Sequence, residues 1–240
     1  MRFVERFSRR DPAKARLAEN RLIHQVAALV LCYPDEALLE QVPLLREVIG
    51  GTSAAAEFAP ALDHLDGAFE VPTSAPGGLE VRFPGERLLA LQAYHVQEFD
   101  LSRRHALHLT YWTEGDTRRR GEVLAAVKQV YRDSGLLVDT GGELPDFLPM
   151  MLEFAAADPE RGVALLSAHR PSLELLRLGL VDDAIPHAGV LAAICDTLPG
   201  PSPQTREEVQ ALVKAIAPVE TVGLEPYGAT FLGLPTLQRS

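Results

Sequence analysis

Apolar residues recur at every third or fourth position along most of this chain, a spacing that places them on one face of an α-helix. In the first part of the chain, three such faces are formed by Leu22, Val26, Leu29 and Val30, by Leu38, Val42, Leu45 and Ile49, and by Phe58, Leu62, Leu65 and Phe69. No segment shows the sustained alternation of apolar and polar residues, next to a hairpin turn, that is typical of β-strands. The spacing therefore predicts an all-α fold.

Proline, glycine and capping residues divide this pattern into separate helices. Pro34 separates the first two helical segments, and residues 71–78 form a turn-rich loop without periodicity. Near the end of the periodic region, Thr205 and Glu208 have the spacing of a capping box, which predicts the start of a last helix.

The length and composition suit a single globular domain. The chain has 240 residues, 47% of them hydrophobic, and can bury a substantial core. After Pro218 the helical spacing stops. We expect one helical-bundle domain over residues 1–218, followed by an irregular tail, extended or disordered, over residues 219–240.

The middle of the chain predicts consecutive helices separated by capping residues. Residues 88–99 have a helical pattern, and Asp100 can cap a second helix over residues 101–112. Asp116 can cap the next helix, which we expect to end near Gly135.

A further helix is expected after the loop that contains Gly141 and Gly142. Pro145 would lie in its first turn, where proline pre-sets the backbone. Its buried face would be formed by Leu144, Leu148, Met151 and Ala155.

Charge and hydropathy exclude several classes of partner and location. The formal net charge is −10, so binding to a phosphate backbone is disfavoured, and no stretch approaches the ~18–20 apolar residues of a membrane span. Cys32 and Cys195 both lie in apolar runs, which favours buried thiols in a reducing compartment. Residues 8–11 contain an arginine pair but lack the apolar run and cleavage site of an export signal. We therefore expect a cytoplasmic protein that neither enters a membrane nor binds nucleic acid.

Candidate metal ligands gather in the middle of the chain. His105 and His108 are three positions apart and could share a helix face, with His95 and Glu98 one element earlier. No HExxH pattern or clustered cysteine pair accompanies them, and no GxSxG, GxGxxG or phosphate-loop motif is present. We expect no metal or cofactor. A helical metal- or haem-dependent enzyme that uses His95, His105 and His108 remains the alternative.

Aromatic residues are concentrated in the same region. Tyr94, Phe99, Tyr111 and Trp112 are four of the 15 aromatic residues and lie within 19 positions of one another. Such a cluster is most often part of a core, but it can also line a groove that accepts an amphipathic peptide. Spacing alone leaves both interpretations open.

The same region resembles the NarJ family, the molybdenum cofactor assembly chaperones of respiratory nitrate reductase. The resemblance is carried by the run FDLxRR…LxLTYxxxGDTRxRG, which corresponds to residues 99–121. It continues through Tyr131 and the segment Glu143–Asp146 into Leu152–Ala155, and covers residues 20–157. This run is longer and more specific than a short catalytic motif.

The resemblance implies a fold, a function and a partner. The family belongs to the wider TorD-like group of all-helical redox-enzyme maturation chaperones, which are not enzymes. Its members bind the apo catalytic (alpha) subunit of nitrate reductase, chiefly through the N-terminal peptide of that subunit. They keep it competent for molybdenum cofactor insertion and prevent early docking with its membrane partners.

The resemblance also implies the position of a client-binding site. Glu143, Pro145 and Asp146 correspond to the signature that marks the peptide-recognition region, whereas Phe147 stands where many relatives have histidine. The predicted client-peptide-binding residues are Tyr94, Phe99, Arg103, Arg104, Tyr111, Trp112, Glu143, Pro145 and Asp146. In this hypothesis the aromatic residues form an apolar wall, and Glu143 and Asp146 meet basic groups of the client. The two acids could equally serve as helix caps.

Overall fold

The computed structural model describes residues 11–67, 84–115 and 117–216. Within these ranges the chain forms eleven α-helices and one π-helical turn, with no strand beyond a single isolated bridge. The prediction of an all-α fold is confirmed. The expected tail over residues 219–240, the loop over residues 71–78 and the proposed caps and contacts of Phe69 and Asp116 lie outside the described residues.

The helices follow one another along the chain with short connections. Their bounds are α1 Pro12–Val30, α2 Glu36–Gly50, α3 Ala55–Leu65, α4 Pro84–His95, η1 (the π-helical turn) Val96–Asp100, α5 Leu109–Glu114, α6 Arg118–Asp133, α7 Leu148–Ala157, α8 Pro159–Ala168, α9 Arg170–Asp182, α10 Ala188–Asp196 and α11 Arg206–Ile216.

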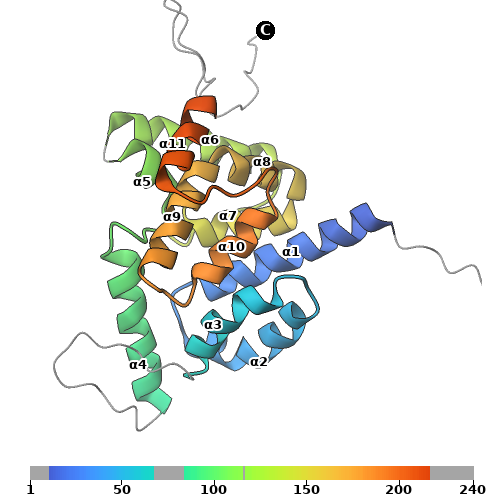
Figure 1. The fold of residues 1–240 in the computed structure, drawn as a ribbon, viewed down its shortest axis with the longest axis vertical. Coiled ribbons are helices and arrows are strands. Elements are labelled where there is room, and N and C mark those ends of the chain that lie inside the picture. Colours follow the sequence, from blue (N-terminus) through green and yellow to red (C-terminus); the bar gives the residue numbers. More distant parts are fainter. Residues whose placement is uncertain (1–10, 68–83, 116, 217–240) are drawn as a thin grey trace, which may run out of the picture.

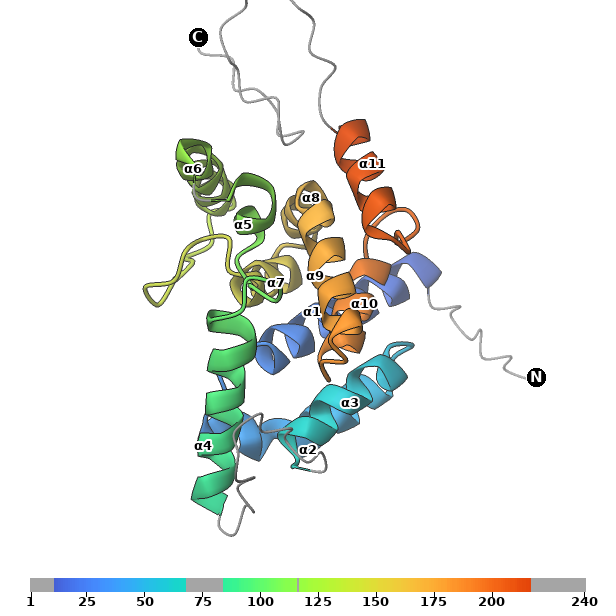
Figure 2. The same ribbon diagram turned by 60° about the vertical axis from the view of Figure 1, so that its left-hand side comes forward.

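The core is organised around α7. Nearly all of its residues are buried, from Leu148 to Ala155, and it packs most closely against α1 and α8. Figures 1 and 2 show α2 and α3 as a layer on the far side of α1, α4 extending away from the rest of the bundle, and α5 and α6 together at the opposite end. A helix that is apolar on all sides is expected at such a central position.

Several helix boundaries agree with the sequence because their signals are local. Asp35 accepts a hydrogen bond from the Leu38 backbone at 2.7 Å and caps α2, and Thr205 accepts one from Glu208 at 3.2 Å and caps α11. The α2 face that was expected in the core is buried throughout. In α1 the pattern is partly wrong, because the side chain of Leu22 is 39% exposed.

The predicted helix over residues 101–112 is wrong. Helix α4 ends at His95, η1 ends at Asp100, and residues 101–108 are not helical, so that only Leu109–Glu114 form α5. The physical reason is a competing backbone interaction. Leu109 N donates to Asp146 O at 3.1 Å, and Leu148 N donates to Leu107 O at 2.9 Å. Backbone groups that a continuous helix would need are therefore bonded to a distant segment.

The expected start of the following helix is also wrong. Leu144 and Pro145 precede α7 instead of forming its first turn, and Leu144 is exposed rather than part of a buried face. Their backbone runs in the turn that leads into the pairing with residues 107–109.

Helix α1 begins away from the body of the molecule. Asp11 caps it by accepting a hydrogen bond from Ala13 N at 3.1 Å, and residues 11–18 are all exposed. In Figures 1 and 2 the first turns of α1 project past the neighbouring helices. Among the described residues, no helix combines the length and the apolar character needed to cross a membrane.

Candidate functional site

Two segments that are almost forty residues apart meet where the sequence motif is densest. His108 and Phe147 form an isolated antiparallel bridge, flanked by the two backbone hydrogen bonds of Leu109 and Leu148 described above. This pairing places the end of the predicted signature, Asp146, directly beside the N-terminus of α5.

Asp146 is the centre of a buried polar network. Its side chain is 0% exposed and accepts hydrogen bonds from Thr110 N at 3.0 Å, Thr110 Oγ1 at 2.5 Å and His108 Nδ1 at 3.3 Å. Thr110 is the second residue of α5, so Asp146 satisfies a backbone N–H that the helix itself cannot bond. Of the two roles considered for this acid, the structure shows helix capping, but of a distant helix rather than its own.

The network keeps Asp146 ionised. Burial alone raises the pKa of a carboxyl group, but the hydrogen bonds from His108 and Thr110 outweigh it and hold the pKa of Asp146 below its usual value. Arg120 adds positive charge, with Nη2 lying 3.8 Å from Asp146 Oδ2 and Nε donating to Thr110 Oγ1 at 3.0 Å. A buried charge is tolerated here because it is both paired and hydrogen-bonded.

Two aromatic side chains fix the surrounding backbone. Tyr131 is buried and donates its hydroxyl to Pro145 O at 2.8 Å. Trp112 is partly buried and donates Nε1 to Ala106 O at 2.9 Å. Each bond joins a helix to a non-helical segment on either side of Asp146.

The outer rim of the site combines apolar and acidic side chains. The His108 ring is partly exposed, lies 5.4 Å from the Phe147 ring and has Nε2 3.8 Å from the carboxylate of Glu143, which is itself exposed. The half-buried Tyr111 ring lies 6.0 Å from the guanidinium of Arg120. Exposed leucines follow in the loop before Glu143, at Leu136, Leu137 and Leu144. We call Tyr111, Glu143, Phe147 and these three leucines the α5 rim.

Tyr94 and Phe99 belong to a different cluster. Tyr94 stacks on His64 with ring centroids 4.5 Å apart, and Phe99 lies 4.9 Å from His95 and 5.2 Å from His187. These contacts join α4 and η1 to α3 and α10 around a cavity of about 10 Å³. By their contacts, the four aromatic residues of the motif therefore divide into two pairs rather than one wall.

Arg103 and Arg104 lie in the non-helical segment before α5, and both are exposed. Arg104 pairs with Asp183 at 3.1 Å, at the end of α9. The buried His105 lies between two carboxylates, with Nδ1 3.2 Å from Glu98 and Nε2 3.0 Å from Asp183. These ionic contacts attach the segment to η1 and α9.

The three histidines of the metal hypothesis do not converge. His95 stacks with Phe99, His105 faces Glu98 and Asp183, and His108 bonds to Asp146. Across residues 11–67, 84–115 and 117–216, no group of three or more potential ligands could hold a metal ion. The idea that His105 and His108 share a helix face is wrong, because this segment is not helical.

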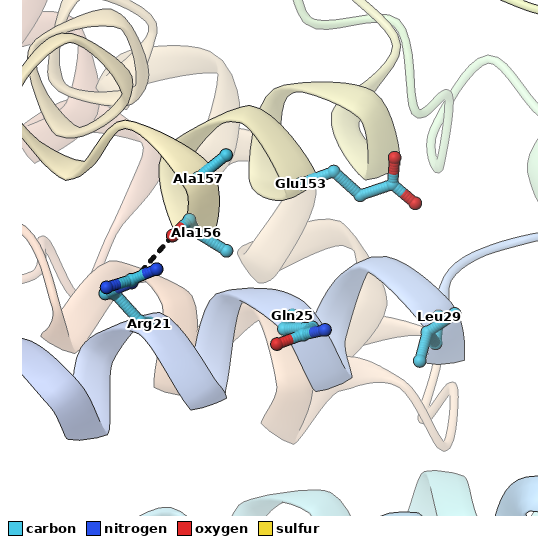
Figure 3. A pocket seen from close by; sticks show the side chains of 6 residues that line it. All are labelled: Arg21, Gln25, Leu29, Glu153, Ala156 and Ala157. Atoms are coloured by element: carbon cyan, nitrogen blue, oxygen red, sulfur yellow. Dashed lines mark hydrogen bonds between the residues drawn. The ribbon is translucent and has the colours of Figure 1, made fainter.

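The largest groove lies elsewhere, between α1 and α7. Its volume is about 290 Å³, and it is lined by Arg21, Gln25, Leu29, Glu153, Ala156 and Ala157. Figure 3 shows Arg21 reaching across from α1 to the end of α7, where Nε donates to Ala156 O at 2.7 Å. No residue predicted for the client site lines this groove.

Some residues that organise the site were not singled out by sequence reasoning. Thr110 and Arg120 lie within the motif that was quoted, so their positions carried a signal but their roles did not. Tyr131 was expected only as an apolar core residue, although its hydroxyl holds Pro145 O. Nothing in the sequence pointed to Asp183 as the partner of His105.

A family model described as nitrate reductase delta subunit matches residues 52–192, which is more than half of the chain and includes α5, the Asp146 network and the α5 rim. The chain belongs to this family. The match confirms the resemblance that was inferred from the motif, and it extends through α9 into α10, beyond the part covered by that motif.

Two relatives with printed functions are similar to this family member. The nitrate reductase-like protein NarX of Mycobacterium tuberculosis is 38% identical over 177 residues, which cover 73% of this chain and 24% of NarX. The nitrate reductase molybdenum cofactor assembly chaperone NarJ of Escherichia coli K12 is 29% identical over 205 residues, covering 77% of this chain and 80% of NarJ. The chain thus spans about a quarter of the length of NarX, but most of the length of NarJ.

The fold also has a counterpart among solved structures. A redox enzyme maturation protein from Archaeoglobus fulgidus superposes with a TM-score of 0.51 and 22% sequence identity. The similarity covers 73% of this chain and 91% of that protein. At this level of identity the comparison supports the helical fold alone.

Proposed function

We propose that this protein is a dedicated, non-catalytic chaperone of respiratory nitrate reductase. It binds the apo catalytic subunit, chiefly its N-terminal segment, in the cytoplasm and keeps it competent for molybdenum cofactor insertion before membrane docking. The observation that carries this proposal is the similarity to the cofactor assembly chaperone of E. coli, which extends over 80% of that protein's length. Membership of the nitrate reductase delta subunit family supports it.

The α5 rim is the surface that we assign to the client peptide. It presents exposed apolar side chains, with Leu137 100% exposed, next to the free-standing carboxylate of Glu143. An amphipathic peptide with basic residues would bury its apolar face against the leucines and Tyr111 and place a cation near Glu143. This is the usual arrangement of apolar anchors inside a polar rim.

The expected affinity is moderate. Burial of two or three large side chains contributes roughly 1.5–3 kcal/mol each, and the ordering of the peptide and of the loop opposes it. Reversible binding suits a chaperone, because the client must be released once it has matured.

The other predicted site residues act behind or beside this surface. Asp146, Pro145 and Trp112 hold α5 and the signature segment together, so we assign them to positioning the rim. Arg103 and Arg104 border it on the preceding segment and could meet acidic groups of the client. Tyr94 and Phe99 support that segment from the cluster beneath η1.

The proposal is tested by calorimetric titration of the full chain with a synthetic peptide of the N-terminal residues of the catalytic subunit. Saturable binding with a Kd in the micromolar range or tighter is expected. Glu143→Gln and Leu137→Ser should each weaken binding about tenfold, because each removes one rim contact.

Matched control variants lie on α2, on another face of the bundle. Glu40→Gln and Leu44→Ser change exposed residues of the same types, and Leu44 is 57% exposed. They should bind the peptide as the parent chain does. Equal losses in the rim and control variants would remove the α5 rim from the proposal, and no binding by the parent chain would refute the function itself.

A further inference from the structure

The charges of this chain are distributed unevenly. Seven of the 23 Lys and Arg residues, but only three of the 33 Asp and Glu residues, lie within residues 1–21. This segment therefore carries a formal charge of +4, whereas the remaining 219 residues carry −14. A strong asymmetry of this kind indicates an electrostatic binding surface.

The described part of the segment is accessible. On the projecting first turns of α1, Lys14, Arg16 and Leu17 are exposed, and within residues 11–67, 84–115 and 117–216 neither Lys14 nor Arg16 forms an ion pair with a carboxylate. The acids nearby are already engaged, because Asp11 caps α1 and Glu19 accepts a hydrogen bond from Ser53 N at 2.6 Å. The cationic side chains are therefore available to an external partner.

The segment also carries apolar side chains. Phe3, Val4 and Phe7 recur at spacings of three and four, and Leu17 is exposed on α1. The four arginines among residues 1–10 are interleaved with them. Aromatic residues mixed with arginine favour the boundary between lipid headgroups and acyl chains, where both kinds of side chain find a partner.

We propose that residues 1–21 form a peripheral binding site for an anionic lipid surface. The basic residues are attracted to the negative headgroups, and the phenylalanines and Leu17 enter the boundary layer below them. Nucleic acid offers the same negative charge but no apolar layer, so lipid fits the composition better. The site goes beyond the proposed chaperone function and would place the chaperone at the surface where its client docks.

The geometry of α1 allows the acidic body to stay away from the surface. The seven residues Pro12–Ala18 extend about 10 Å along the helix axis, and the Debye length at physiological ionic strength is about 8 Å. The projecting turns seen in Figures 1 and 2 therefore hold the cationic residues roughly one screening length beyond the neighbouring helices. Repulsion between the −14 body and the lipid is largely screened at this separation.

The experiment is co-sedimentation of the full chain with vesicles, one set with 30% phosphatidylserine or phosphatidylglycerol and one of phosphatidylcholine alone. Binding to the anionic set that weakens as salt is raised is expected, with little binding to the neutral set. Lys14→Glu combined with Arg16→Glu should lower the affinity at least tenfold, since each basic residue near such a surface contributes about fivefold. Phe3→Ser combined with Phe7→Ser should lower it without changing the salt dependence.

A matched control keeps the net charge change equal. Lys128→Glu combined with Arg132→Glu alters two exposed residues of α6 by the same four charges and should bind vesicles as the parent chain does. An equal loss in the α1 and α6 variants would overturn the site, as would equal binding to neutral vesicles or a higher affinity for duplex DNA than for anionic vesicles. Peptide titration without vesicles tests the chaperone function separately.

Discussion

The histidines of this chain are used differently in two regions of the molecule. Among the packed helices, His24, His64, His169 and His187 are buried, and His24, His169 and His187 each have a ring nitrogen without a hydrogen-bond partner among the described residues. In the region from η1 to the start of α7, His105 and His108 face carboxylates of Glu98, Asp183 and Asp146. The first group packs as neutral aromatic rings, and the second links segments that are distant in sequence.

This difference teaches how each region is held together. Helix packing relies on apolar burial, into which a neutral imidazole fits at some cost. The site region has little regular structure between Leu101 and His108, so specific polar bonds define its conformation. Acid, volume and charge should therefore affect the two regions unequally.

The largest expected effect is acid destabilisation through the packed helices. Burial lowers the pKa to about 4 for His24, His64 and His169 and to about 3 for His187. Below pH 6.5 the unfolded chain binds protons that the folded chain does not, so the free energy of unfolding decreases as pH falls from 6.5 towards 4. A loss on the order of 4–8 kcal/mol by pH 5 is expected.

Urea unfolding between pH 7.5 and pH 5 measures this slope. His187→Phe removes one of the titrating groups and should make the slope shallower by up to one proton, whatever the variant does to stability at pH 7.5. The Asp146 network does not oppose the trend, because the pKa of Asp146 is held below its usual value and its contribution is lost only at more acidic pH. A free energy of unfolding that is constant from pH 7.5 to pH 5 would contradict the comparison.

The next effect concerns volume at the contact between α3 and α10. A Cβ atom on Gly189 would overlap the backbone carbonyl of Glu57, which cannot move as a flexible side chain could. Gly189→Ala should therefore lower the free energy of unfolding by about 3 kcal/mol or more, as measured by urea denaturation. Gly121→Ala is the control, because Gly121 is exposed in α6 with nothing within 4 Å of the new Cβ, and it should stabilise the chain by about 0.5–1 kcal/mol.

The site region responds instead to loss of charge. Asp146→Asn retains the shape of the side chain but removes the charge that accepts from Thr110 and His108 and faces Arg120. We expect a loss of about 2–3 kcal/mol and a changed near-ultraviolet circular dichroism signal of Trp112, because α5 loses its cap. Wild-type stability in this variant would show that the network is not what holds α5.

The smallest effect sharpens the same point with a single neutral hydrogen bond. Tyr131→Phe removes the bond to Pro145 O and should cost about 1 kcal/mol in thermal or urea unfolding. Tyr33→Phe, on a tyrosine that is largely exposed, should leave stability within ~0.5 kcal/mol of the parent chain. If the two substitutions have equal effects, the Tyr131 hydroxyl contributes nothing specific to the site.

Sequence reasoning succeeded where the deciding interactions are local. The face formed by Leu38, Val42, Leu45 and Ile49, the capping box at Thr205 and the helix start at Pro159 all depend on residues within one turn of each other. The motif also identified the family and pointed to the segment that contains Asp146. It could not assign Asp146 a role, because the partners Thr110 and Arg120 are 36 and 26 positions away in the chain.

The failures all lie in the segment between Asp100 and Leu148. Residues 101–108 have a helical pattern but are not helical, since their neighbours bond to the backbone of residues 146–148. A close approach adds to this, because the position of a Cβ on Gly179 would be only 2.7 Å from Arg104 O. Neither contact leaves a periodic signal in the sequence.

The amino-acid sequence by itself determined the all-α class, most helix ends and the family, because helical periodicity, caps and a long motif are properties of neighbouring residues. Only the tertiary structure decided that the helix expected after Asp100 is replaced by an irregular segment, and that Asp146 points inwards to cap α5 while Glu143 faces outwards. The physical reason is that a backbone N–H or a carboxylate takes the partner that the assembled fold brings within reach, and for these groups that partner comes from a distant part of the chain.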